Sequence, residues 1–351
     1  MGLNPSFWLG KRVLVTGHTG FKGSWLTLLL TELGAKVVGL ALPENDTQSL
    51  YKDARISSLL AREYIQDIRE YEKTNDAIYS QDIDYVFHLA AIALVRKSVR
   101  EPIESFTTNI TGTANVVLSA LSSTTVMGIT VATTDKVYKN LGTVYPFKES
   151  DKLGGDDPYS ASKAAAEFVV CALANSNNPR SIPVTTVRAG NVIGGGDWGE
   201  ERLVPDLIRA INSSSVLNIR NPNATRPWQY ILDCLYGYLL VAQAQMELRS
   251  DFPKAVNIGP KHSLSVSELI DLFAGVLGKP IEYEVLVPNI HEHNNLVLDS
   301  SLAERVLGWQ PSFTTSQSVV QTATWYRKFM SGSDAQQLMY DEILSYKVGK
   351  W

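Results

Sequence analysis

Residues 11–23 read Lys-Arg-Val-Leu-Val-Thr-Gly-His-Thr-Gly-Phe-Lys-Gly, an apolar run that ends in three glycines spaced three apart. The run predicts a short buried strand, and helical periodicity follows it in residues 21–33. Glycines between a strand and a helix allow a tight turn and let backbone N–H groups approach a pyrophosphate at the helix N-terminus. A glycine turn without a ligand is the alternative. We interpret the loop as dinucleotide-binding, with contacts from Gly17, Gly20, Phe21 and Gly23.

The alternation of strands and helices continues after this loop. Further strands are predicted at residues 36–42, 64–66, 85–88, 128–133 and 184–188, and helices at 70–80, 106–122 and 158–175. Strands separated by helices predict an α/β fold with a doubly wound parallel (Rossmann) sheet and right-handed crossovers. Beyond residue 188, amphipathic helices are expected around 266–277 and 317–330. We therefore expect a dinucleotide-binding domain at 1–188 and a smaller, interwoven substrate lobe at 189–351.

Composition restricts the class of protein. The 351 residues contain 32 Lys and Arg against 36 Asp and Glu, a net charge of −4 without a basic block, so no nucleic-acid partner is expected. Charged residues interrupt the apolar stretch 26–42, so no membrane span is expected either. Cys171 and Cys234 lack the spacing of a disulfide framework or a metal clip, which predicts a reducing, cytoplasmic compartment. The alternating histidines of 291–293 have no third ligand, and no metal is assigned.

Tyr159 and Lys163 lie four residues apart at the start of a predicted helix, which places them one turn apart on one face. An ammonium beside a phenol favours the phenolate and lowers its pKa from about 10 toward neutrality. Such a phenol takes the proton of a substrate hydroxyl while hydride leaves the same carbon. A solvated helix face is the alternative, but the glycine loop upstream favours the redox interpretation.

Thr134, Asp135 and Lys136 end the fifth predicted strand, at the edge where open α/β sheets bind ligands. Successive strand residues point to opposite faces, so all three reach one substrate only if the chain bends where the strand stops. The alternative is a polar strand end with an exposed ion pair.

Together these segments resemble the extended short-chain dehydrogenase/reductase family. The resemblance covers residues 8–346 and includes Phe87-His88-Leu89-Ala90-Ala91, Pro158 to Lys163, Arg188 to Val192 and Arg226-Pro227-Trp228-Gln229. Within the family, Thr-Asp-Lys, Gly194-Gly195-Gly196-Asp197-Trp198 and the loop 18–23 are most similar to CDP-glucose 4,6-dehydratases.

The resemblance implies a lyase that dehydrates a nucleotide hexose, with bound NAD reduced and reoxidised in each turnover. Tyr159 would be the base at the C4 hydroxyl, Lys163 would hold the nicotinamide ribose, and Thr134 would bond the same substrate oxygen. Lys136 would remove the C5 proton while Asp135 protonates the departing C6 hydroxyl. This assignment requires a lysine pKa near 7–8 and a raised carboxyl pKa.

The resemblance also implies further contacts. Asp67 and Ile68 would contact the adenine side of the cofactor, and Ala90 and Ala91 would line it. The substrate would be bound by Arg96, Asn191 and Arg226, the last gripping pyrophosphate oxygens with its planar guanidinium.

Some positions depart from the dehydratase pattern. Residues 141–146 lack the tryptophan-rich sequence that is usual there, Asn294-Asn295 replaces His-Tyr, and Tyr230 stands where His is frequent. The identity of the nucleotide and of the sugar is therefore left open. No acidic clamp or arginine ends the second strand, and NAD rather than NADP is expected from the family alone.

The alternatives are a nucleotide-sugar 4-epimerase and a non-catalytic dinucleotide-sensing protein of the same fold. Family members pair through two helices of each subunit, so apolar faces in 109–121 and 159–174 imply a homodimer by similarity.

Overall fold

A seven-stranded parallel sheet forms the centre of the molecule, with strand order β11-β6-β5-β4-β1-β2-β3. The computed structural model describes residues 2–44, 46–140, 142, 145–286 and 296–350. The strands are β1 (Arg12–Thr16), β2 (Lys36–Ala41), β3 (Arg62–Ile65), β4 (Tyr85–His88), β5 (Gly128–Ala132), β6 (Val184–Arg188) and β11 (Ala255–Asn257). This confirms the α/β, doubly wound class and each strand predicted up to residue 188, with ends shifted by at most two residues.

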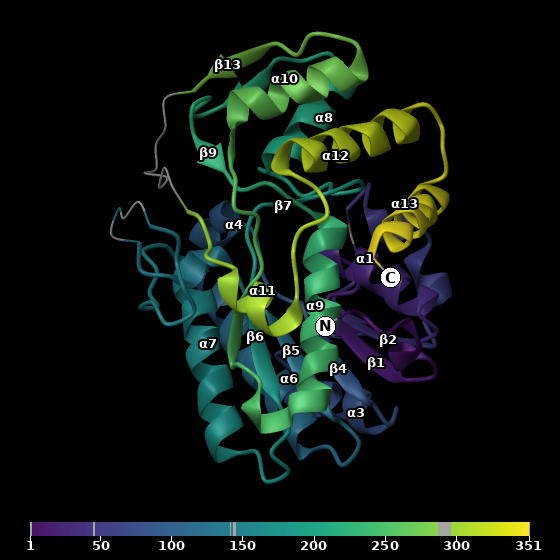
Figure 1. Ribbon diagram of the computed structural model, residues 1–351, viewed down its shortest axis with the longest axis vertical. Coiled ribbons are helices and arrows are strands. Elements are labelled where there is room, and N and C mark those ends of the chain that lie inside the picture. Colours follow the sequence, from purple (N-terminus) through teal and green to yellow (C-terminus); the bar gives the residue numbers. More distant parts are fainter. Residues whose placement is uncertain (1, 45, 141, 143–144, 287–295, 351) are drawn as a thin grey trace.

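Helices cover both faces of the sheet, as Figure 1 shows. One face packs against α3 (Tyr71–Tyr79), α6 (Thr113–Ser122) and α7 (Pro158–Ser176), through a buried aliphatic cluster that includes Leu14 and Val131. The other face packs against α1 (Phe21–Glu32) and α9 (Ile231–Leu248) through the larger cluster around Trp25 and Phe87. The central strands β1, β4, β5 and β6 are therefore covered on both faces, which accounts for their near-continuous apolar runs.

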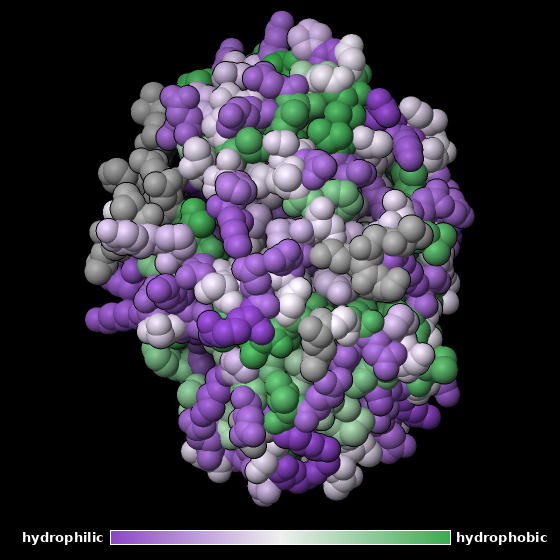
Figure 2. Space-filling view, viewed as in Figure 1, coloured by the Kyte–Doolittle hydropathy of each residue, from purple (hydrophilic) through white to green (hydrophobic). Residues whose placement is uncertain are grey.

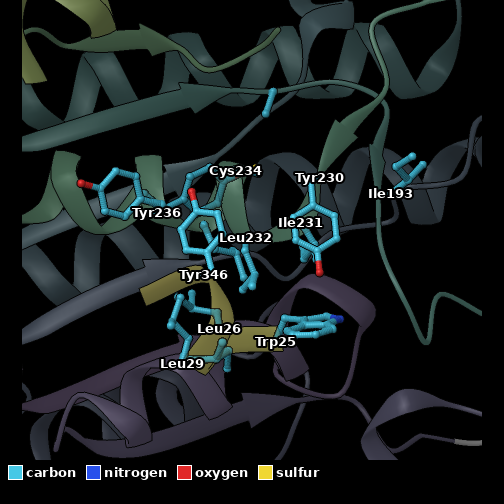
Figure 3. Packing of buried hydrophobic residues seen from close by; sticks show 14 of the residues in the cluster. Trp25, Leu26, Leu29, Ile193, Tyr230, Ile231, Leu232, Cys234, Tyr236 and Tyr346 are labelled. Carbon is cyan, nitrogen blue, oxygen red and sulfur yellow. The ribbon is translucent and has the colours of Figure 1, made fainter. Parts of the chain in front are cut away.

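Helix α9 comes from the chain beyond residue 188, and the sequence patterns do not predict it. Residues 231–245 of this helix are all buried, and although Asp233, Gln243 and Gln245 are polar, the helix shows no amphipathic stripe. Strand β11 follows it and pairs with β6, so residues 231–257 return to the sheet. Figure 3 shows side chains of α9 packing beside Trp25, Leu26 and Leu29 of α1, with Tyr346 from the C-terminal helix nearby.

The remaining elements form the upper part of Figure 1. They include α8 (Leu203–Ser213), α10 (Val266–Leu277), α12 (Thr315–Met330), α13 (Ala335–Lys350), and the short pairs β7 (Val192–Ile193) with β10 (Gln229–Tyr230), β9 (Thr225–Arg226) with β12 (Leu264–Ser265), and β8 (Leu217–Ile219) with β13 (Tyr283–Val285). The predicted helices at 266–277 and 317–330 are confirmed. Figure 2 shows one face on which hydrophobic side chains gather in small groups, one of them near the top over α10.

Short elements connect these layers. They are the 3-10 helices η1 (Pro5–Trp8), η2 (Ile56–Leu59), η4 (Asp135–Val137) and η5 (Arg249–Asp251), the helices α2 (Leu50–Asp53), α4 (Val95–Arg100), α5 (Pro102–Phe106) and α11 (Ser301–Leu307), and one π-helical stretch, η3 (Thr107–Gly112). The predicted helix 106–122 is thus a π turn followed by α6. Within the residues listed above as described, no helix is both long and apolar enough to cross a membrane.

Candidate functional site at the carboxyl edge of the sheet

The glycine loop joins β1 to α1 at the carboxyl edge of the sheet. Gly17 has φ +75°, and a Cβ atom there would lie 2.8 Å from the backbone nitrogen of Ala90. A Cβ on Gly23 would lie 2.1 Å from the carbonyl oxygen of Gly17, so glycine is required for the close approach of helix and loop. Gly20 is the N-cap of α1 and has no side chain over the first N–H groups. This cradle fits a dinucleotide pyrophosphate at a helix N-terminus.

The strand ends beside the loop carry the other residues expected at the cofactor. The backbone nitrogen of Ala90 donates to Thr16 Oγ1 at 3.1 Å, and Ala90 and Ala91 are half-buried. Asp67 forms an ion pair with Arg69 at 2.6 Å, and hydrogen bonds from this guanidinium lower the pKa of the carboxyl. Ile68 is buried. These residues share the edge at which β1, β3 and β4 end.

The chain bends where β5 ends. Such a bend is required if Thr134, Asp135 and Lys136 are all to reach one substrate. Thr134 is the N-cap of η4, and its Oγ1 donates to Asp135 Oδ1 at 2.9 Å and accepts from the Lys136 backbone nitrogen at 3.3 Å. Asp135 is 2% exposed, whereas Lys136 is exposed. The bend therefore separates the pair into one buried carboxyl and one accessible amine.

Burial raises the pKa of Asp135, the direction expected for a group that donates a proton. The charges of Lys136, Lys22 and Arg226 and the hydrogen bond of Thr134 oppose this effect. Oδ2 is buried and has no hydrogen-bond partner among the described residues, and a Cβ on Gly190 would lie 1.9 Å from it. Asp135 is thus a dry carboxyl that can keep its proton.

Tyr159 differs from the sequence-based expectation. Burial raises its pKa to about 12, and the negative charges of Asp135 and Asp157 add to the increase, while the interaction with Thr134 and the charge of Arg202 oppose it. The expected fall of the pKa toward neutrality is therefore wrong in direction. The phenol is 9% exposed, and loss of water outweighs the nearby cations.

Lys163 lies one turn further along α7, and its Nζ donates to the carbonyl oxygen of Ala132 at 2.8 Å. Burial lowers its pKa to about 8, helped by the charge of Lys22 and opposed by that of Glu167. Glu167 is one more turn along the same helix and forms a buried ion pair with Arg188 at 2.8 Å. Tyr159, Lys163 and Glu167 thus form one buried helix stripe, whose last member the sequence patterns do not single out.

Two cations near the acid and the phenol are also missed by sequence reasoning. Lys22, half-buried in the glycine loop, acts on the charges of Asp135 and Lys163. The Arg202 Nη1 contacts both carboxylate oxygens of Asp197 at 3.0 Å, and its charge acts on Tyr159. Lys22 does lie inside the predicted loop, but its proximity to Asp135 depends on the three-dimensional fold.

The predicted substrate contacts divide into two groups. Arg226 is half-buried, burial lowers its pKa, and it is close enough to Asp135 for the two charges to interact. Asn191 has φ +46° and its carbonyl accepts from Gln229 N at 3.1 Å, which places it at the turn between β6 and β7. Arg96 lies further out on α4 and pairs with Glu201 at 3.4 Å. The described residues contain no cluster able to hold a metal ion, and 291–293 lie outside them.

Comparisons with known proteins agree with this architecture. A family model described as GDP-mannose 4,6 dehydratase matches residues 14–322. The chain is 38% identical over 353 residues to a CDP-glucose 4,6-dehydratase of Salmonella typhimurium, with 98% of each chain covered. It is 25% identical to a UDP-glucose 4-epimerase of Halalkalibacterium halodurans, over 91% of this chain and 97% of the relative.

A solved structure has the same fold. It is a UDP-glucose-4-epimerase of Stenotrophomonas maltophila with bound NAD and formylated UDP-arabinopyranose. The TM-score is 0.81 at 22% identity, covering 92% of this chain and all of the other.

Proposed function

The chain belongs to the GDP-mannose 4,6 dehydratase family of extended short-chain dehydrogenases/reductases, and from this premise we propose that it is a nucleotide-hexose 4,6-dehydratase of the CDP-glucose type. The observation that carries the proposal is the bend at Thr134–Lys136, where Thr134 and the buried Asp135 act on Tyr159 and the exposed Lys136 follows them. The 38% identical relative supports CDP-glucose as the substrate class.

NAD is the proposed cofactor, and it would accept a hydride from the sugar and return it. Gly17, Gly20, Phe21 and Gly23 would hold its pyrophosphate, because the cradle between Gly17 and Ala90 has room for backbone contact but not for a Cβ atom. Ala90 and Ala91 would line the site, and Asp67 and Ile68 would border the adenine. The NAD in the Stenotrophomonas maltophila epimerase supports this choice.

The side chains then have separate proton-handling roles. Tyr159 would take the proton of the C4 hydroxyl, with Thr134 bonding the same oxygen. Oxidation at C4 makes the C5 proton acidic, Lys136 would remove it, and Asp135 would protonate the departing C6 hydroxyl. The raised pKa of Asp135 supports the acid role. Because Lys136 is exposed, we propose that the bound sugar supplies the burial that its base role requires.

The pKa of Tyr159 must fall when the cofactor binds if its phenol is to act as a base. Burial raises the pKa of Tyr159 to about 12, so its phenol is neutral at pH 7. A cationic nicotinamide ring held near Tyr159, with Lys163 drawn to its ribose, would favour the phenolate. We therefore propose that the Tyr159–Lys163 pair becomes active only in the loaded enzyme.

Turnover assays test the activity directly. The protein is incubated with each nucleotide hexose in turn, and the 4-keto-6-deoxy product is detected by its ultraviolet absorbance in alkali. Conversion of CDP-glucose, or of another nucleotide hexose, supports the dehydratase. Sugar inverted at C4 with no keto product would instead identify an epimerase, which the 25% identical relative makes the second candidate.

Replacement of Lys136 by Ala separates these two candidates at the level of mechanism. An epimerase needs Tyr159 and Lys163 but no acid and base at C6 and C5, so its turnover should change little. In a dehydratase the variant should lose product formation by about a hundredfold or more, the usual contribution of a general base, while bound NAD is still reduced transiently. Rapid-mixing absorbance at the reduced-nicotinamide band measures this. Lys139→Ala, a half-buried lysine three residues on, is the control.

The assembly and location follow as parts of the same proposal. We propose a cytoplasmic homodimer, in which α6 and α7 of two subunits pack together. Two free cysteines, Cys171 exposed and Cys234 buried, suit a reducing compartment. We also propose that residues 1–188 bind NAD while the lobe beyond them binds the nucleotide sugar through Arg96, Asn191 and Arg226.

A further inference from the structure

Several arginines gather on the substrate side of the carboxyl edge. Arg96 and Arg100 lie on α4, Arg220 follows β8, and Arg226 lies on β9. Burial lowers the pKa of Arg220, and the positive charges of Arg96 and Arg226 lower it further. Like charges held this close repel each other, so the cluster is best suited to an anionic ligand.

A carboxylate of the protein lies within this cluster. Glu201 Oε1 accepts from Arg100 at 3.0 Å and from Arg96 at 3.4 Å, and the charge of Glu201 also acts on Arg220. The second oxygen, Oε2, is buried and has no hydrogen-bond partner among the described residues. The backbone of Glu201 has φ +58°, in the left-handed region that non-glycine residues rarely occupy.

Two other carboxylates near the site contact arginine differently. Glu167 binds Arg188 through both oxygens, at 2.9 and 2.8 Å, and Asp197 binds Arg202 through both, at 3.0 Å. The two parallel contacts of the Glu167–Arg188 pair, from Nε and Nη2, fix the orientation of that guanidinium. Glu201 uses one oxygen for two arginines, leaves the other dry and holds an unfavourable backbone conformation. These features are more typical of a carboxylate that a ligand can displace than of one that positions the arginines.

We propose that Glu201 is an internal competitor for the substrate: its carboxylate occupies part of the place that the diphosphate of the nucleotide sugar takes, and substrate binding displaces it. This inference rests on the proposed function, because it identifies the anion as a nucleoside diphosphate. The diphosphate carries more charge and more acceptor oxygens than one carboxylate, so it can contact Arg96, Arg220 and Arg226 together. Glu201 keeps these like charges compensated until the substrate arrives.

Displacement of Glu201 would also reach the catalytic phenol. The next residue is Arg202, whose charge acts on Tyr159 and which is bound to Asp197. A change of backbone at Glu201 therefore occurs one residue from a cation that influences the base. Substrate recognition at the diphosphate and activation of Tyr159 would be linked through this short segment.

Binding measurements on the full-length protein test the proposal. Inorganic pyrophosphate, CDP and cytidine are titrated calorimetrically into wild type, Glu201→Gln and Glu200→Gln. Glu200 is the matched control, since it is an exposed glutamate next in sequence and its replacement changes the net charge equally. Glu201→Gln should bind pyrophosphate and CDP about three- to tenfold more tightly, the usual scale for one partly screened charge, and cytidine unchanged. Glu200→Gln should stay within about twofold of wild type.

Equal or weaker pyrophosphate binding by Glu201→Gln overturns the proposal, since a carboxylate that positions the arginines predicts weakening. Absence of measurable pyrophosphate binding to every form overturns it as well. Failure of the proposed function gives a different pattern: wild type converts no nucleotide hexose, yet Glu201→Gln still tightens pyrophosphate binding. In an active enzyme the same variant should lower KM for the nucleotide sugar, and Glu200→Gln should not.

Discussion

At the scale of single residues, burial has a larger effect at this site than neighbouring charge. The pair Tyr159 and Lys163 is recognisable from its spacing, and the structure places both on one buried stripe of α7. The expected sign of the phenol shift is wrong because spacing shows which charges are near but not how much water is removed. Thr134 and Asp135 lie at the predicted bend, and the raised pKa of Asp135 follows the expected direction.

Lys163 should reduce stability while it serves the reaction. Its pKa falls from 10.5 to about 8, so at neutral pH a buried ammonium is held at a free-energy cost. Lys163→Met should therefore increase the free energy of unfolding of the cofactor-free protein by about 2 kcal/mol at pH 7, an order-of-magnitude value from the shift, while activity falls. Thermal melts and turnover assays measure the two effects.

The pH dependence of the free energy of unfolding follows from the lowered pKa of Lys163. Between pH 8 and 10.5 the unfolded chain keeps a proton that folded Lys163 has lost, so wild-type stability rises with pH through this window. The advantage of Lys163→Met should be largest below pH 8 and should disappear toward pH 10.5. Lys152→Met, at an exposed lysine, is the control. A variant that is less stable than wild type at pH 7 contradicts the account.

At the scale of elements, periodicity identifies the outer helices and the strand ends, while it misses α9. A helix that is buried on all sides has no amphipathic face to detect, and its packing against the sheet and α1 is visible only in three dimensions. For the same reason the contacts of Glu201 with α4 could not be predicted, because they join residues about a hundred positions apart. The electrostatic effects of Lys22 on Asp135 and of Arg202 on Tyr159 likewise depend on contacts between segments that are far apart in the sequence.

The C-terminal helix α13 is docked through the carboxyl of Glu342, a half-buried residue. Glu342 is hydrogen-bonded to the Tyr230 hydroxyl, and burial raises its pKa to about 8. Between pH 4.5 and 8 the folded protein keeps a proton that the unfolded chain has lost, so wild-type stability falls as pH rises through this window. Glu342→Gln, which stays neutral, should increase the free energy of unfolding by about 1 kcal/mol or more at pH 8.5.

Thermal melts of Glu342→Gln across pH 4.5 to 8.5 measure this effect. The gain should be smallest at pH 4.5, where the folded Glu342 carboxyl keeps its proton and the unfolded one is about half protonated. Asp271→Asn, at an exposed position on α10, controls for the loss of one negative charge. A gain that does not depend on pH would show that the carboxyl is not the titrating group.

At the scale of the whole molecule, the outer face of α7 and its neighbours carries exposed apolar side chains. Ile103 is 74% exposed, Phe168 61% and Val99 47%. Exposed apolar groups of this size on adjacent helices favour a partner surface, and the proposed homodimer would cover them. Phe168→Glu should shift the protein to monomer at micromolar concentration, which sedimentation equilibrium measures. Leu344→Glu, also exposed but on α13, should leave the assembly unchanged.

A wild-type protein that sediments as a monomer at tens of micromolar would rule out this assembly. So would a Phe168→Glu variant that remains a dimer. The sequence indicated which helices carry apolar residues, while the choice of outward-facing side chains required the fold.

The return of residues 231–257 to the sheet has a further consequence for how this protein can change over evolutionary time. Gln245 on α9 donates to the carbonyl oxygen of Ile129 at 3.1 Å inside the sheet, and Trp309 donates to the carbonyl of Asp233 at the other end of the same helix. Genetic recombination near residue 188 would therefore replace α9 and β11, which are part of the central sheet and its helix layer, together with the segments that follow residue 188. New sugar preferences are expected to arise through point changes in loops rather than by shuffling of modules.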